Sequence, residues 1–170
     1  MEINYEAYAR LNRILENNGP SEFGRISQIL LAFAFVRTGY KVSNMQLSGR
    51  PDMVVEKDGK FFNIEAKTSS GSQITLKKED IESVKKLSGV PIISILTFPD
   101  IDSRWLFIDA KKLYPGKIDK SYLVQFSVNF METDINSIFS IIVKEECADN
   151  ITGQKLHEKF NRLYVKTIMP

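Results

Sequence analysis

The feature that most constrains the fold is a β-hairpin signal between residues 52 and 67. Two runs rich in β-branched and aromatic residues, 52–57 and 60–67, are separated only by Asp58-Gly59, a dipeptide typical of two-residue hairpin turns. A hairpin sets the start of its first strand beside the end of its second. Asp52 can therefore lie opposite Glu65 and Lys67, which share one face because strand residues alternate.

The residue types at this end of the hairpin predict a metal-dependent phosphodiesterase. The carboxylates of Asp52 and Glu65 are the oxygen ligands that Mg²⁺ prefers, and the carbonyl of Ala66 is well placed to add another oxygen. Lys67 beside such a metal can orient or deprotonate a water, or stabilise charge on a phosphate. The alternative interpretation, without a catalytic site, is a hairpin with ordinary surface charges and a cross-strand ion pair. Against it, these charges follow the apolar run 61–64, where unpaired charges are costly.

The pattern Pro51-Asp52 … Glu65-Ala66-Lys67 resembles the PD-(D/E)xK motif of the restriction-endonuclease-like nucleases. Residues 24–109 look most like the archaeal Holliday junction resolvases of that superfamily. The matching segments are Gly39-Tyr40-Lys41-Val42, the hairpin, Ile74-Thr75-Leu76-Lys77-Lys78, the strand from Pro91 and Arg104-Trp105-Leu106-Phe107-Ile108. The resemblance implies an α/β, restriction-endonuclease-like fold, a central mixed β-sheet flanked by helices. It also implies a DNA endonuclease that uses Mg²⁺, with Mn²⁺ as a substitute.

One departure from the resolvase pattern concerns the helix before the motif. The resolvases carry a metal-binding glutamate there, and the matching position is Gln28, whose neutral amide should weaken Mg²⁺ binding. We expect Gln28 to complete the catalytic site with Asp52, Glu65 and Lys67. The alternative acid is Glu22, which lies about 240° round the helix and is also suited to the positive end of the helix dipole.

Four further polar residues are candidates for DNA contact: Arg50, Ser69, Lys77 and Lys78. Each has an ordinary explanation as well. Arg50 can pair with a neighbouring acid, Ser69 lies in a polar loop, and the two lysines can form a solvated helix start. We interpret them as phosphate contacts that position the substrate.

Three functional hypotheses remain open at this point. The first is a resolvase-like endonuclease that acts on branched DNA as a homodimer, since two-fold symmetry matches a four-way junction. The second is a restriction-type or mobile-element (homing) endonuclease that cuts duplex DNA, favoured by the segments outside the resolvase-like block. The third is a catalytically weakened DNA-binding relative, suggested by Gln28.

Periodicity organises the chain as one domain, residues 1–170, with a nuclease core at 22–109. An N-terminal helix (1–21) precedes the core and an extension of unknown role (110–170) follows it, where apolar residues around 138–142 can form a dimer interface or extend the core. Ser21 is expected to cap the second helix. We expect helices at 3–17, 22–38, 77–88, 133–143 and 153–165, a polar loop at 68–73, and strands at 40–47, 52–57, 60–67, 91–98, 105–109 and 122–128.

Composition adds bounds rather than a function. The formal net charge is only +2, but residues 22–90 hold 11 basic and 8 acidic side chains, a net of +3, so the excess falls in the nuclease-like block. One cysteine and one histidine exclude a disulfide framework and a structural zinc site. No apolar run has membrane-spanning length. We expect a cytoplasmic protein without a membrane partner, associated with the nucleoid when bound to DNA.

Overall fold

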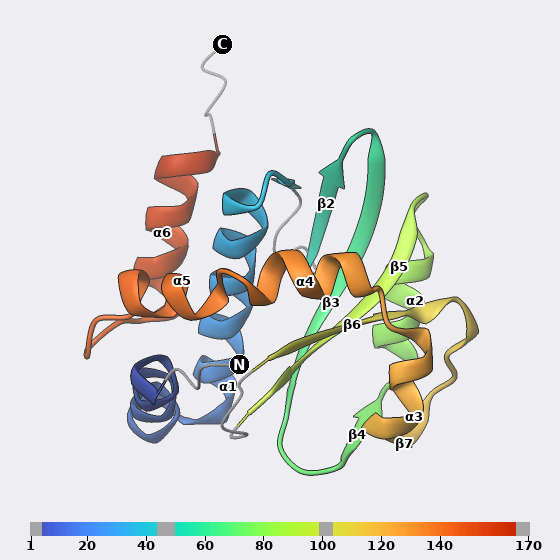
Figure 1. The fold of residues 1–170 in the computed structure, drawn as a ribbon, viewed down its shortest axis with the longest axis horizontal. Coiled ribbons are helices and arrows are strands. Elements are labelled where there is room, and N and C mark those ends of the chain that lie inside the picture. Colours follow the sequence, from blue (N-terminus) through green and yellow to red (C-terminus); the bar gives the residue numbers. More distant parts are fainter. Residues whose placement is uncertain (1–4, 44–49, 99–103, 166–170) are drawn as a thin grey trace.

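A computed structural model describes residues 5–43, 50–98 and 104–165 (Figure 1). The α-helices are α1 (Tyr5–Arg37), α2 (Lys78–Lys85), α3 (Lys120–Leu123), α4 (Asn129–Asn136), α5 (Phe139–Glu146) and α6 (Gly153–Tyr164). The strands are β1 (Lys41–Ser43), β2 (Met53–Lys57), β3 (Lys60–Ser69), β4 (Gln73–Leu76), β5 (Val90–Thr97), β6 (Trp105–Asp109) and β7 (Gly116–Asp119). Two 3₁₀ turns, η1 (Ala110–Lys112) and η2 (Val124–Phe126), complete the elements.

The central sheet has five strands in the order β1-β2-β3-β5-β6. It is mixed, because β3 and β5 run parallel while the other neighbours are antiparallel. A parallel pair needs a crossover connection, and α2 lies within it. Strands β4 and β7 form a separate two-stranded sheet near α3 (Figure 1). The expected fold class, a central mixed sheet flanked by helices, is confirmed.

The two faces of the sheet bury different helices. Along β5, Ile92 and Leu96 join the core built with α1, α4, α5 and α6, whereas Ile93 and Ile95 join a smaller core with α2. This alternation follows from the two-residue period of a strand. It places α1 and α2 on opposite sides of β3, the strand that carries the expected catalytic residues.

Helix α1 is two helical segments joined at Gly19, whose backbone (φ 78°, ψ 173°) is not helical. The conformation has positive φ, which glycine adopts at little cost. Pro20 then begins the second segment, a position where its missing N–H is not needed. The expected break between residues 17 and 22 is confirmed, but Ser21 lies inside the second segment rather than capping it.

The hairpin forms with the expected two-residue turn. Asp58 (φ 53°) and Gly59 (φ 76°) both have positive φ, as a type I′ turn requires. The register runs from Lys57 opposite Lys60 to Met53 opposite Ile64. The local sequence therefore fixes both the turn and the pairing of β2 with β3.

Three expected elements differ from the structure, and a fourth is described only in part. Residues 122–128 are not a strand: α3 and η2 occupy 120–126, and Ser127 makes an isolated bridge to Ile108. The expected helix at 133–143 is two helices, because α4 ends before Ser137. The expected loop at 68–73 is shorter, since β3 extends through Ser69 and β4 begins at Gln73. Of the expected strand 40–47, β1 covers 41–43, and 44–47 lies outside the described residues.

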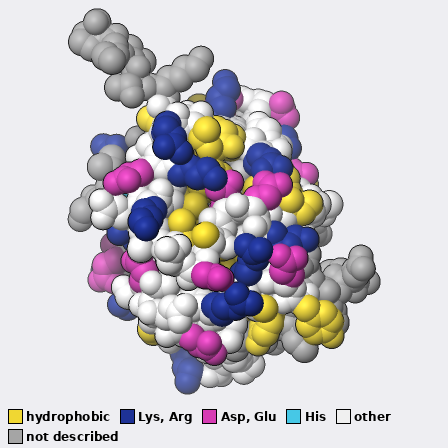
Figure 2. All heavy atoms as spheres, turned by 90° about the vertical axis from the view of Figure 1, so that its left-hand side faces the viewer, with side chains coloured by type: hydrophobic (Ala, Val, Ile, Leu, Met, Phe, Trp, Pro, Cys, Tyr) yellow, Lys and Arg dark blue, Asp and Glu magenta, His cyan; other side chains and the backbone are white. Residues whose placement is uncertain are grey.

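The C-terminal helices extend the core. Phe139 and Ile142 are buried in the core that includes α1, while Ile141 stays 41% exposed. Figure 2 shows the face formed by α1, α5 and α6, where basic and acidic side chains are interspersed. Ion pairs there include Arg13–Asp149 (2.9 Å) and Arg37–Glu145 (2.7 Å). This face is therefore no continuous basic platform. Within the described residues, no helix is both long and apolar enough to cross a membrane.

Candidate active site

The site begins where β2 stops pairing with β3. The last paired residues are Met53 and Ile64, and two more steps in the same register would set Pro51 opposite Ala66. Proline has no N–H to donate to a sheet ladder. Beyond Ile64, β3 continues to Ser69 with β5 on one side, and no strand among the described residues pairs with its other edge there.

The side chain of Asp52 provides one hydrogen bond that a continued β2–β3 ladder would have made to Ala66. Its Oδ2 accepts a hydrogen bond from the backbone N–H of Ala66 at 2.8 Å. The N–H and C=O of one strand residue point to the same side, as in the hydrogen-bonded pairs of an antiparallel ladder. The carbonyl of Ala66 therefore lies on the side of Asp52, where Pro51 offers no donor. This arrangement supports the expectation that Ala66 contributes an oxygen to the site.

Glu65 and Lys67 lie on the face of β3 that is covered by α2. The Lys67 Nζ is 3.0 Å from Glu65 Oε1 and 2.7 Å from Asp80 Oδ1. The hydroxyl of Ser83 donates to Glu65 Oε2 at 3.3 Å. Two residues on one strand are thus held by two residues one helical turn apart on α2.

A cavity of about 300 Å³ joins these groups to the start of the second segment of α1. Asp52, Glu65, Ala66 and Lys67 line it together with Pro20, Ser21, Gly24, Gln28, Thr68 and Trp105. The structure therefore brings all four expected catalytic residues, Gln28 included, to one cavity. Glu22, the alternative acid, is not among the lining residues: its Oε1 accepts from the backbone N–H of Gly153 at 2.6 Å.

Two polar atoms of the lining residues are buried without a hydrogen-bond partner among the described residues. They are the amide Nε2 of Gln28 and the indole Nε1 of Trp105. Buried polar groups are nearly always paired with protein or water. These two N–H groups are available to donate to a water or to an acceptor oxygen of a bound molecule.

The environment of the two acids in the cavity, Asp52 and Glu65, disfavours their ionised forms and raises their pKa values. Burial, reinforced by the nearby Asp52, raises the pKa of Glu65 to about 7, although Lys67 opposes the shift. Burial also raises the pKa of Asp52, with the Ala66 N–H and Lys67 opposing it. Two close carboxylates with raised pKa values are a pattern found at functional sites.

Lys67 shows the opposite balance. Burial lowers the pKa of its ammonium, but the hydrogen bond to Asp80 and the charge of Glu65 outweigh burial, so the pKa is raised. These contacts favour the protonated ammonium, which can donate hydrogen bonds and stabilise negative charge.

The four candidates for DNA contact lie outside the cavity lining. Arg50, Lys77 and Lys78 are exposed, and Lys78 is 3.6 Å from Glu82 on the next turn. The hydroxyl of Ser69 donates to the carbonyl of Gln73 at 3.0 Å. Their proposed role in binding DNA stays a prediction.

Asp80 is the main site residue that the sequence did not reveal. An acid in the first turn of a helix has an ordinary role in capping, and the N–H of Lys77 does donate to Asp80 Oδ2 at 3.1 Å. Its second contact, with Lys67, depends on the placement of α2 across β3, which local sequence does not encode. Trp105 is fully buried and also lines the cavity.

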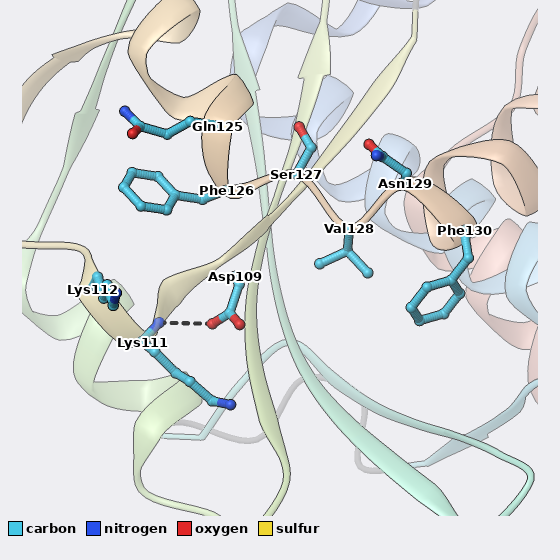
Figure 3. A pocket seen from close by; sticks show the side chains of 9 residues that line it. All are labelled: Asp109, Lys111, Lys112, Gln125, Phe126, Ser127, Val128, Asn129 and Phe130. Carbon is cyan, nitrogen blue, oxygen red and sulfur yellow. Dashed lines mark hydrogen bonds between the residues drawn. The ribbon is translucent and has the colours of Figure 1, made fainter.

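A second cavity of about 640 Å³ lies between the end of β6 with η1 and the segment 125–130 that leads into α4. Figure 3 shows its lining, in which Asp109 is the carboxylate and accepts from the backbone N–H of Lys111 at 2.9 Å. Phe126 and Phe130 are among its other lining residues. This cavity lacks a pair of acids, so it does not compete with the first as a hydrolytic site.

Comparison with known proteins identifies the family. The sequence model of the archaeal Holliday junction resolvase family, Hjc, matches residues 31–144, about two thirds of the chain. The protein belongs to this family. Holliday junction resolvases are nucleases of the restriction-endonuclease-like superfamily that act on DNA, so the expected family and superfamily are confirmed. The match starts after Gln28, so that position rests on the structure and not on the family model.

A solved structure is also similar to this chain. It is Hjc, a Holliday junction resolvase from the archaeal hyperthermophile Archaeoglobus fulgidus, with 18% sequence identity and a TM-score of 0.47. The similarity covers 65% of this chain and 98% of that one. No curated protein matches the chain.

Segments outside the family match pack against each other. Arg13 pairs with Asp149, and Glu22 accepts from Gly153. Phe33 of the matched region stacks edge-on with Phe160 of α6 at 5.2 Å. The additional helices therefore close over the outer side of α1, away from β3.

Proposed function

We propose that this protein is a Mg²⁺-dependent endonuclease that hydrolyses phosphodiester bonds of branched DNA at a PD-(D/E)xK site. The observation that carries the proposal is the cavity beyond the end of β2. It gathers Asp52, Glu65, Ala66 and Lys67 where the pairing of β2 with β3 ends. Family membership supplies the substrate class.

The residues present fit a hard divalent cation. Burial raises the pKa of both Asp52 and Glu65, and the charge of Asp52 raises the pKa of Glu65 further; a cation between the two carboxylates would favour their ionised forms. Among the described residues, no group of three or more His, Cys, Asp or Glu is arranged as a metal cage. Mg²⁺ is commonly held by one or two carboxylates plus water, so Asp52, Glu65 and the Ala66 carbonyl would hold it. When bound, the metal would supply Lewis-acid stabilisation and a more acidic water.

The remaining residues would orient the substrate and stabilise charge. Lys67 would offer its ammonium to a phosphate oxygen as negative charge develops. The buried donors of Gln28 and Trp105 would hold acceptor oxygens of the bound molecule. The start of the second α1 segment at Pro20 also lines the cavity, and a helix N-terminus favours an anion.

The assembly that suits this function is a homodimer. A four-way junction has two-fold symmetry, and a pair of equivalent sites can cut two strands. Arg50, Ser69, Lys77 and Lys78 would contact phosphates on the DNA arms. We expect such a protein to work in the cytoplasm, where the DNA is.

The test compares a synthetic four-way junction with a linear duplex of the same arms and with plasmid DNA. With Mg²⁺ or Mn²⁺, wild-type protein should cut the junction and spare the duplex. Lys67→Ala should fold and bind the junction but not cut it. Cleavage of linear duplex at a fixed sequence would favour a restriction-type or homing enzyme. Junction binding without cleavage in either metal would show a catalytically weakened relative, the reading suggested by Gln28.

A further inference from the structure

The ammonium of Lys67 is shared between two carboxylates that have different surroundings. Glu65 Oε1 and Asp80 Oδ1 lie 3.0 and 2.7 Å from Lys67 Nζ. Glu65 lines the cavity with Lys67, whereas Asp80 is not among its lining residues. Asp80 thus contacts Lys67 from α2, outside the cavity that Glu65 lines.

Glu65 alone would be a poor anchor for Lys67 in a working site. Its Oε2 accepts from Ser83 and its Oε1 from Lys67, so an oxygen given to a cation would no longer be fully available to the ammonium. Asp80 faces no such competition. A lysine ammonium has three N–H groups; with one held by Asp80, the others remain for the cavity.

Asp80 is itself held rigidly. It lies in the first turn of α2, where its Oδ2 accepts from the backbone N–H of Lys77 at 3.1 Å. The far end of α2 is tied to β3, since the buried Asn63 side chain donates to the carbonyls of Val84 (3.0 Å) and Leu87 (3.1 Å). Contacts at the start of α2 and near its end therefore hold the helix, and with it Asp80, in place over Lys67 on β3.

We propose that Asp80 is a positioning residue that keeps the Lys67 ammonium directed at the cavity when Glu65 is engaged by the metal. This inference rests on the proposed function. Asp80 acts through Lys67 and does not itself touch the substrate. It extends the catalytic apparatus from the two strands of the hairpin to the helix that crosses behind them.

The test uses Asp80→Asn with Glu79→Gln as a matched control. Asparagine keeps an oxygen for the Lys77 N–H, so it removes the charge but retains the helix cap. Glu79 is an exposed acid in the same turn, so its loss reproduces the change in net charge and helix dipole. If Asp80→Asn does not melt cooperatively, Asp80→Ser, which also retains an acceptor, replaces it.

Single-turnover cleavage of the junction at saturating protein gives the first readout. Asp80→Asn should slow cleavage about 10–100-fold, the usual cost of losing a group that orients a functional side chain, with an unchanged Kd for junction in Ca²⁺. An Asp80→Asn rate equal to that of Glu79→Gln would overturn the proposal.

A second readout needs neither metal nor cleavage. In ¹⁵N-labelled, metal-free protein, the Lys67 ammonium should give an NMR signal protected from exchange with water, assigned by its absence in Lys67→Ala. Because Glu65 can still hold the ammonium in the metal-free protein, the measured quantity is the rate of exchange with water. The signal should exchange as slowly in Glu79→Gln as in wild type and clearly faster in Asp80→Asn, which loses the shorter of the two contacts of Lys67 Nζ. Equal exchange rates in Asp80→Asn and Glu79→Gln would overturn the anchoring role, even for a wild type that cuts no DNA. Lack of wild-type cleavage alone would instead contradict the proposed function.

Discussion

Replacing Glu65 by glutamine should stabilise the metal-free protein while abolishing DNA cleavage. Glutamine has nearly the shape of the protonated carboxyl and keeps polar atoms for Ser83 and Lys67. The pKa of Glu65 rises from 4.5 to about 7 in the folded protein, chiefly through burial and then through the charge of Asp52. Since one pKa unit corresponds to about 1.4 kcal/mol, the ionised carboxylate costs the fold about 3 kcal/mol.

The sign of the pH dependence follows from this shift. Because the folded pKa lies above the unfolded one, the free energy of unfolding is unaffected below pH 4.5 and falls as the pH rises toward about 7. The substituted protein lacks this loss. The difference between Glu65→Gln and wild type should therefore be near zero at pH 4, grow between pH 4.5 and 7, and level off above that.

Urea denaturation followed by circular dichroism, in EDTA and at several pH values, measures the difference. Glu79→Gln on the surface of α2 is the control and should match wild type within about 0.5 kcal/mol. Adding Mg²⁺ should raise the midpoint of wild type but not of Glu65→Gln, because binding stabilises only the protein that has the ligand. A Glu65→Gln protein less stable than wild type at pH 8 would refute the reasoning, since Glu65 would then be a net stabilising ion-pair partner of Lys67.

Asp52→Asn should keep the fold, because an amide oxygen can still accept from the Ala66 N–H, and should lower junction cleavage by at least about 100-fold. A gel shift in Ca²⁺ checks that the variant still binds the junction. Retained cleavage would show that Asp52 does not belong to the active site. Gln28→Glu should reduce the Mg²⁺ concentration for half-maximal cleavage by roughly 10-fold, since an added carboxylate strengthens cation binding; an unchanged requirement would place Gln28 outside the metal's reach. Phe33→Ala should lower the free energy of unfolding by about 3–5 kcal/mol, because Phe33 is 1% exposed and packs on Phe160 of α6. Urea denaturation measures this change. A loss under about 1 kcal/mol would mean that α6 is not docked on α1.

The part of the site that sequence reasoning reached is the part encoded over a few residues. Asp58-Gly59 specifies a type I′ turn, and the turn fixes which residues of the two strands lie together. The position of Asp52 beside Glu65 and Lys67 follows from that alone. Pro51 has an effect that only the structure shows. The hydrogen-bonded pairing of β2 with β3 ends before Pro51, which leaves Ala66 of β3 without a strand partner on that side among the described residues.

The features that sequence reasoning missed depend on distant partners. Residues 122–128 contain alternating apolar residues typical of a strand, yet the outer edge of β6 is satisfied mainly by other groups. The backbone N–H of Trp105 donates to the Asn136 side chain and that of Phe107 to Glu132, both on α4. With the edge already satisfied by α4, the preceding residues are free to form α3 and η2.

Asp80 shows the same limit at the active site. Its sequence context, an acid in a helical first turn, is fully explained by capping, and its contact with Lys67 appears only once α2 lies across β3. By contrast, β4 had a readable signal that was overlooked. Ile74 and Leu76 are buried while Gln73 and Thr75 are exposed, the alternation expected for a strand.

The central claim is that Asp52 and Glu65 hold one divalent cation at the edge of β3 where its pairing with β2 ends. Crystals grown or soaked with Mn²⁺ and measured for anomalous scattering test it directly. The account predicts one strong peak between the carboxylates of Asp52 and Glu65, within coordination distance of the Ala66 carbonyl, and no such peak in Asp52→Asn crystals. A Mn²⁺ peak elsewhere with none at Asp52 and Glu65, or an occupied site that Asp52→Asn leaves unchanged, would contradict it.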